Sequence, residues 1–172
     1  MKRMAFLRRL RELIAVYGSG NVVYFDESGF RKHSYRAHGW ALRGEKIYGD
    51  VSGRNRKCLN LVMAWRQKKW LAPETFGESC DAERVNAWLE SKLMPLLKEP
   101  SIVVMDNAPF HKKKEIAAIL EKGGHVLLPL PPYSPDFNPI ENSFGAIKRK
   151  REFAPPGTSV IELIRTSDSY LE

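Results

Sequence analysis

The sequences NVVYFD, residues 21–26, and SIVVMD, residues 101–106, carry the pattern that decides the fold. Each is a short apolar run rich in β-branched residues, which is typical of a buried strand, and each is predicted to end on its aspartate. In a mixed α/β sheet, the ends of neighbouring strands meet at one edge. The pattern therefore predicts that Asp26 and Asp106 lie close together.

Between and after these two runs, the chain alternates further strand patterns with helical ones. Apolar, turn-bounded segments predict additional strands at residues 33–42, 58–65 and 125–128. Apolar side chains at three-four spacing predict helices at residues 4–17, 81–97, 112–121, 138–150 and 161–170. This order of elements predicts an α/β fold, a mixed five-stranded sheet flanked by helices on both faces.

Length and composition predict one folded domain without structural cross-links. The chain has 172 residues, of which 43% are hydrophobic, and its two cysteines, Cys58 and Cys80, are isolated from each other. No apolar run approaches about 18 residues, and no apolar stretch follows a basic N-terminus, so neither a membrane span nor a secretion signal is predicted. We expect reduced thiols and a cytoplasmic location.

Positive charge is concentrated in one part of the sequence. The formal net charge is +8, and residues 31–69 carry eleven Lys and Arg against two acids. A polyanion such as DNA is the natural partner of such a block, although an ordinary solvated basic surface is the alternative. The candidate DNA contacts are Arg54, Arg56 and Lys57 in this block, and Lys148, Arg149 and Lys150 in the predicted helix 138–150.

A third acid, Glu141, lies in the sequence YSPDFNPIEN, residues 133–142. Asn138 is a good N-cap, Pro139 suits the first helical position and Glu141 falls at the third, which together make a capping box. The alternative is that the Pro-rich segment fixes the start of the helix so that Glu141 faces the other two acids. Oxygen-only ligands of this kind suit Mg²⁺ or Mn²⁺.

Several neighbouring residues are candidates for supporting roles. Glu27 should point to the face of the strand opposite Asp26, where it is structural or supports the acids from behind. Asn107 and His111 follow the second acid and could orient water or contact phosphate, although a structural histidine is equally consistent. Asp136 is expected to form a turn, and Trp40 is expected in the core.

Three sequence strings together resemble one family. They are YFDESG at residues 24–29, VMDNAP at residues 104–109 followed by His111, and YSPDFNPIEN at residues 133–142. With 34 residues between Asp106 and Glu141, they resemble the catalytic domain of mariner-like DDE transposases, and the bacterial insertion sequence 630 branch in particular. The resemblance covers about residues 20–150.

The resemblance implies an RNase H-like fold in which Asp26, Asp106 and Glu141 are catalytic and bind two Mg²⁺ or Mn²⁺ ions. It further implies DNA cleavage at transposon ends and 3′-hydroxyl strand transfer into target DNA, with a homodimer in the DNA complex. We expect an N-terminal basic helix or linker remnant at residues 1–19, a catalytic domain at residues 20–172 and no helix-turn-helix domain in this chain. The alternatives are an RNase H-like nuclease without strand transfer and a domesticated, non-catalytic DNA-binding module.

Overall fold

The structure is a computed structural model that describes residues 2–31, 40–48, 58–77, 80–155 and 157–170. Its centre is a five-stranded sheet in the order β3-β2-β1-β4-β5. The first three strands form an antiparallel meander, while β4 and β5 run parallel to β1. The strands are β1 (Val22–Arg31), β2 (Cys58–Arg66), β3 (Lys69–Phe76), β4 (Ile102–Met105) and β5 (Val126–Pro129). The mixed five-stranded sheet predicted from the sequence is confirmed.

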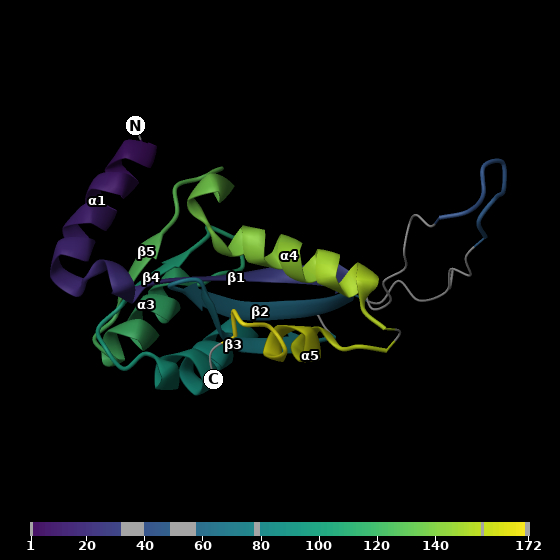
Figure 1. Ribbon diagram of the computed structural model, residues 1–172. Coiled ribbons are helices and arrows are strands. Elements are labelled where there is room, and N and C mark those ends of the chain that lie inside the picture. Colours follow the sequence, from purple (N-terminus) through teal and green to yellow (C-terminus); the bar gives the residue numbers. More distant parts are fainter. Residues whose placement is uncertain (1, 32–39, 49–57, 78–79, 156, 171–172) are drawn as a thin grey trace.

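Helices cover both faces of this sheet (Figure 1). Because successive strand residues point to opposite faces, Val23 and Phe25 of β1 pack toward α2 and α3, whereas Val22 packs toward α1. Beside α1 on that second face, α4 packs over β1 and α5 packs over β3, and side chains of β2 belong to the same apolar cluster. The helices are α1 (Lys2–Tyr17), α2 (Ala82–Trp88), α3 (Lys113–Lys122), α4 (Ile140–Phe153) and α5 (Val160–Arg165).

Strand β1 is longer than the sequence predicted, and this places the first acid differently. β1 pairs with β4 only from Val22 to Tyr24, but its pairing with β2 continues to Arg31. Asp26 therefore lies within β1, and the prediction that it ends the strand is wrong. It nevertheless lies just beyond the point where β4 stops, and Asp106 directly follows the last residue of β4. The end of β4, rather than the end of β1, brings these acids to one place.

The third strand of the meander is β3, which the sequence did not predict. Of the predicted strand at residues 33–42, residues 33–39 lie outside the described residues and residues 40–42 are not in a strand. Instead, β2 turns directly into β3 through Gln67 and Lys68, whose φ angles are 49° and 64°. Two positive φ angles in succession are typical of a type I′ hairpin turn, which usually contains Asn or Gly. Lacking those residues, this turn gave no sequence signal.

The helical region predicted at residues 81–97 is α-helical only at its start. Asp81 caps α2 by accepting a hydrogen bond from the backbone nitrogen of Arg84 at 2.9 Å, as expected. After Trp88 the helix widens into a π-turn at Leu89–Leu93 and then tightens into a 3₁₀ turn at Met94–Leu96. Leu89 and Leu93, the first and last residues of the π-turn, are both buried in the core under the sheet.

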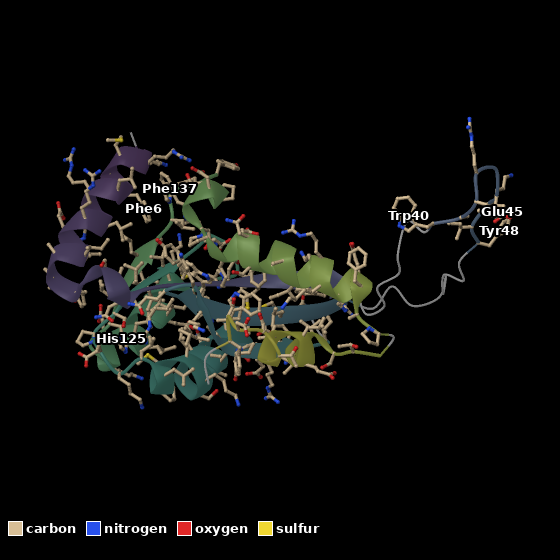
Figure 2. All side chains as sticks on the ribbon, viewed as in Figure 1. Phe6, Trp40, Glu45, Tyr48, His125 and Phe137 are labelled. Atoms are coloured by element: carbon tan, nitrogen blue, oxygen red, sulfur yellow. The ribbon has the colours of Figure 1, made fainter. Side chains whose placement is uncertain are left out.

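Residues 40–48 extend away from the body of the protein (Figures 1 and 2). Trp40 is fully exposed there, so its expected place in the core is wrong. Among the described helices, none is long and apolar enough to cross a membrane.

The β2–β3 turn gives a first prediction. Lys68→Gly should raise the free energy of unfolding by up to about 1 kcal/mol, because glycine adopts a positive φ without the steric cost of a Cβ atom. The control is Ala118→Gly on the exposed side of α3, which should lower the free energy of unfolding by about 1 kcal/mol. Chemical denaturation measures both, and a loss of stability in both variants would contradict the turn assignment.

Candidate active site

A cleft of about 620 Å³ opens where β4 ends, and all three predicted acids line it. Asp26 comes from β1, Asp106 from the loop after β4, and Glu141 from the first turn of α4. Glu27 is a fourth carboxylate in the wall. The remaining lining residues are Asn107, Ala108, Pro109, Leu130, Pro131, Pro132, Tyr133, Ser134, Pro135 and Asn138.

Asp26 is the most buried of these acids, with only 9% of its surface exposed. One carboxylate oxygen accepts a hydrogen bond from the backbone nitrogen of Glu27 at 2.7 Å, and the other accepts from Nδ2 of Asn138 at 2.8 Å. Burial raises the pKa of Asp26 to about 8, and the negative charges of Glu27, Asp106 and Glu141 add to the rise. Near neutral pH, Asp26 therefore holds a proton in the metal-free protein.

Asp106 is more exposed and is held by its own loop. Its Oδ1 accepts a hydrogen bond from the backbone nitrogen of Ala108 at 3.0 Å, which fixes the turn after β4. The buried His111 lies behind it, with Nε2 at 3.5 Å from Oδ1 of Asp106 and at 3.4 Å from Oε2 of Glu27. His111 thus links two acids of the cleft from the core side.

Asn107, in the wall of the cleft, is held by two hydrogen bonds of its side chain. The Asn107 side-chain amide donates a hydrogen bond to the carbonyl of Leu130, just after β5. Its side-chain oxygen accepts one from Nζ of Lys113 in α3. Asn107 therefore ties the loop of the second acid to the neighbouring strand and helix.

The capping box predicted at the start of α4 does not form. Pro139 occupies the N-cap position, and no side chain caps the helix there. Asn138 instead donates a hydrogen bond from its side-chain Nδ2 to Asp26, and its Oδ1, the atom that would cap the helix, has no hydrogen-bond partner. Glu141 is exposed on the cleft side of the first turn, with its backbone nitrogen bonded to the carbonyl of Asn138 at 3.3 Å. The alternative placement of Glu141, facing the other two acids, is the observed one.

The donor chemistry of the cleft suits a divalent cation. Glu27 Oε1 and Asn138 Oδ1 are buried without a hydrogen-bond partner, and both residues line the cleft. Buried polar atoms normally have partners, so their grouping here indicates a site that a ligand completes. Within the described ranges, no set of three or more Asp, Glu, His or Cys side chains is already spaced to hold one ion. The acids face the cleft without closing around a common point.

The basic residues predicted to contact DNA divide into two groups. Lys148, Arg149 and Lys150 are exposed on α4, the helix that begins beside the cleft. Nζ of Lys148 lies 5.3 Å from the centre of the Phe30 ring, so its stem crosses the end of β1. Arg54, Arg56 and Lys57 lie outside the described residues.

The fold and the acid-lined cleft define the class of protein, and comparison with known proteins agrees with them. Residues 21–162 match the family described as DDE superfamily endonuclease, and the chain belongs to that family. None of the curated proteins matches the chain.

Solved structures of the Mos1 transposase share the fold. The Mos1 paired-end complex with left transposon end has a TM-score of 0.74 and 21% identity, covering 98% of this chain and 55% of that one. The Mos1 mariner paired end complex with Mn has a TM-score of 0.71 with the same identity and coverage. The Mos1 strand transfer complex has a TM-score of 0.62 and 22% identity, covering 95% of this chain and 56% of that one. These matches establish the RNase H-like fold, and the chain spans about half the length of the Mos1 chains.

Sequence reasoning did not find the contact between Asn138 and Asp26. An asparagine before Pro-Ile-Glu has the same local sequence whether it caps the helix or bonds a remote acid. No local pattern separates the two, because the second partner lies 112 positions away in the chain.

The raised pKa of Asp26 gives a second prediction. Unfolded Asp26 ionises near pH 3.8, whereas in the fold it keeps its proton up to about pH 8. The metal-free protein should therefore lose unfolding free energy as pH rises through this window, by a few kcal/mol more than Asp26→Asn does. Denaturant titrations of both proteins at about pH 5, 7 and 9 test this. Identical pH profiles would mean that Asp26 is ionised in the fold.

Proposed function

We propose that this chain is the catalytic domain of a mariner-like DNA transposase, of the bacterial insertion sequence 630 branch. The observation that carries the proposal is that Asp26, Asp106 and Glu141, from three separate segments, line one cleft. Membership of the DDE endonuclease family and the fold shared with Mos1 support it. The three sequence strings around these acids favour the insertion sequence branch.

In this proposal, the three acids hold two Mg²⁺ or Mn²⁺ ions. When bound, such ions activate the attacking oxygen and neutralise charge on the leaving oxygen of a phosphoryl displacement. Asn138 fixes the orientation of the Asp26 carboxylate, and the backbone nitrogen of Ala108 fixes that of Asp106. His111 and Glu27 support these acids from the core side, and Asn107 holds the loop. The carboxylates bind ions and need not act as nucleophiles.

The DNA partner follows from charge and from the position of α4. Lys148, Arg149 and Lys150 lie about two turns beyond Glu141 on the helix that begins at the cleft, so a duplex whose scissile phosphate lies in the cleft can reach this part of α4. Arg54, Arg56 and Lys57 are further proposed contacts on sequence grounds. We propose a homodimer on paired transposon ends, by analogy with the Mos1 paired-end complex, in the bacterial nucleoid.

The decisive test of this function removes one acid without changing its shape. Asp106→Asn should reduce Mn²⁺-dependent cleavage of transposon-end DNA by at least about 10³-fold, because a neutral amide is a poor ligand for a hard cation. DNA retention in a mobility-shift assay should be unchanged. The matched control is Asp81→Asn at the start of α2, where asparagine caps as well as aspartate does.

The products separate the proposed function from its alternatives. Joining of pre-cleaved 3′ ends to a target plasmid supports a transposase, whereas cleavage without joining indicates a nuclease. DNA retention with no cleavage by the wild type, under conditions where it binds Mn²⁺, would leave a DNA-binding module.

Phosphate contacts on α4 give a fourth prediction. Arg149→Ala should weaken DNA binding to all sequences and lower the slope of log affinity against log salt by about one unit. Lys122→Ala, at the far end of α3, is the control and should leave the slope unchanged. An unchanged slope in both variants would remove Arg149 from the DNA interface.

A further inference from the structure

Arg3 of α1 contacts the turn that leads into α4 through hydrogen bonds and an aromatic ring. Its Nη1 and Nη2 atoms donate to the two carboxylate oxygens of Asp136 at 2.9 and 2.5 Å, and Nη1 also donates to Oγ of Ser134 at 3.1 Å. The guanidinium carbon lies 4.1 Å from the centre of the Phe137 ring. One side chain thus contacts three residues of a single turn, the 3₁₀ turn η4 (Pro135–Phe137) and the serine before it.

Phe6, one helical turn after Arg3, contacts the same segment. Its ring stacks on that of Phe137 with centroids 5.6 Å apart and planes inclined by 15°. Figure 2 shows the two rings facing each other between α1 and η4. Phe6 is only 7% exposed and packs into the core with Ile102 and Leu128. The contact between α1 and η4 is therefore anchored in the core of the protein.

This contact differs from an ordinary surface ion pair. Isolated exposed pairs contribute little to stability. Here the planar guanidinium meets a carboxylate with two parallel hydrogen bonds and stacks on an aromatic ring, which a lysine cannot reproduce. The hydrogen bond from Arg3 also lowers the pKa of Asp136. By contrast, Arg9 on the same helix pairs only locally, with Glu12 at 3.1 Å.

The residues directly before and after η4 both line the cleft. Ser134, buried at 4% exposure, lines the cleft just before η4. Asn138, just after it, bonds Asp26 and accepts the backbone hydrogen bond of Glu141. The segment enters this turn through Tyr133 with φ at 53°, a conformation that a residue with a Cβ atom keeps only when its surroundings hold it.

We propose that α1 positions the active-site segment Ser134–Glu141, with Arg3 and Phe6 holding η4 so that Asn138 and Glu141 are placed before metal and DNA bind. Helix α1 lies outside residues 21–162, which match the family, so nothing in the family match assigns it this role. The consequence for metal binding and cleavage rests on the proposed function. The consequence for the rigidity of the segment does not.

The test compares Arg3→Ala, Arg3→Lys and the control Arg9→Ala with the wild type. Hydrogen exchange is followed at the backbone amides of Phe137, Asn138 and Glu141, which donate hydrogen bonds within the segment. Arg3→Ala should speed their exchange by about tenfold with little change in Tm, since Arg3 is exposed. Arg3→Lys should resemble Arg3→Ala. Lysine keeps the positive charge, but it lacks the planar guanidinium that makes two parallel hydrogen bonds and stacks on Phe137.

Calorimetric Mn²⁺ titration and Mn²⁺-dependent cleavage complete the test. Arg3→Ala should weaken Mn²⁺ binding by about threefold to tenfold and raise the Mn²⁺ concentration for half-maximal cleavage to match, with the rate at saturating Mn²⁺ retained. Joint replacement by Arg3→Asp and Asp136→Arg should restore part of the loss.

Two outcomes overturn the proposal. If Arg3→Ala exchanges and binds Mn²⁺ as Arg9→Ala does, α1 does not position the segment. If Arg3→Lys keeps the wild-type exchange rates and Mn²⁺ affinity, the positive charge alone holds the segment and the geometry of the guanidinium is not needed. If the wild type neither binds Mn²⁺ nor cleaves DNA, the proposed function is wrong. The comparison of hydrogen exchange between the variants would still decide the role of α1.

Discussion

The parallel pairing of β1 with β4 ends early, and the rest of the site depends on that ending. Pairing covers Val22 to Tyr24, after which β4 turns away and β1 continues beside β2 alone. The backbone on that side of β1 is left without a neighbouring strand just where Asp26 lies. The loop of Asp106 and the start of α4 fill part of this space, and the cleft is what remains.

Burial and charge repulsion both act against the ionised form of Asp26 in this cleft. Four carboxylates face a space in which Asp26 is almost out of contact with water, so their charges repel and one of them takes up a proton. Hydrogen bonds from Asn138 and from backbone nitrogens hold the acids in place without neutralising them. The protein thus maintains a crowded set of negative charges at a cost in stability, as is common where a site is organised for a ligand.

Much of this architecture could be predicted from the sequence, because the two aspartates follow strongly apolar runs and the helices have clear periodicity. The convergence of Asp26, Asp106 and Glu141 was predicted from strand ends and from family resemblance, although of the two strands only β4 ends at the site. What could not be predicted depends on contacts between distant residues. Asn138 has the local pattern of a helix cap, and only the folded chain brings Asp26 to it. Likewise, β3 is started by a turn without Asn or Gly, which no turn signal marks.

The hairpin formed by β1 and β2 has a further consequence for how such chains can diverge. Arg31 pairs directly with Cys58, so the chain leaves the sheet and returns to it at adjacent points, on the far side of Asp26 from β4. Closing a longer loop between fixed ends costs little extra entropy. Residues can therefore be added or removed between these two positions without moving the acids. Related chains are free to vary what they carry at this hairpin end while keeping the same chemistry at the cleft.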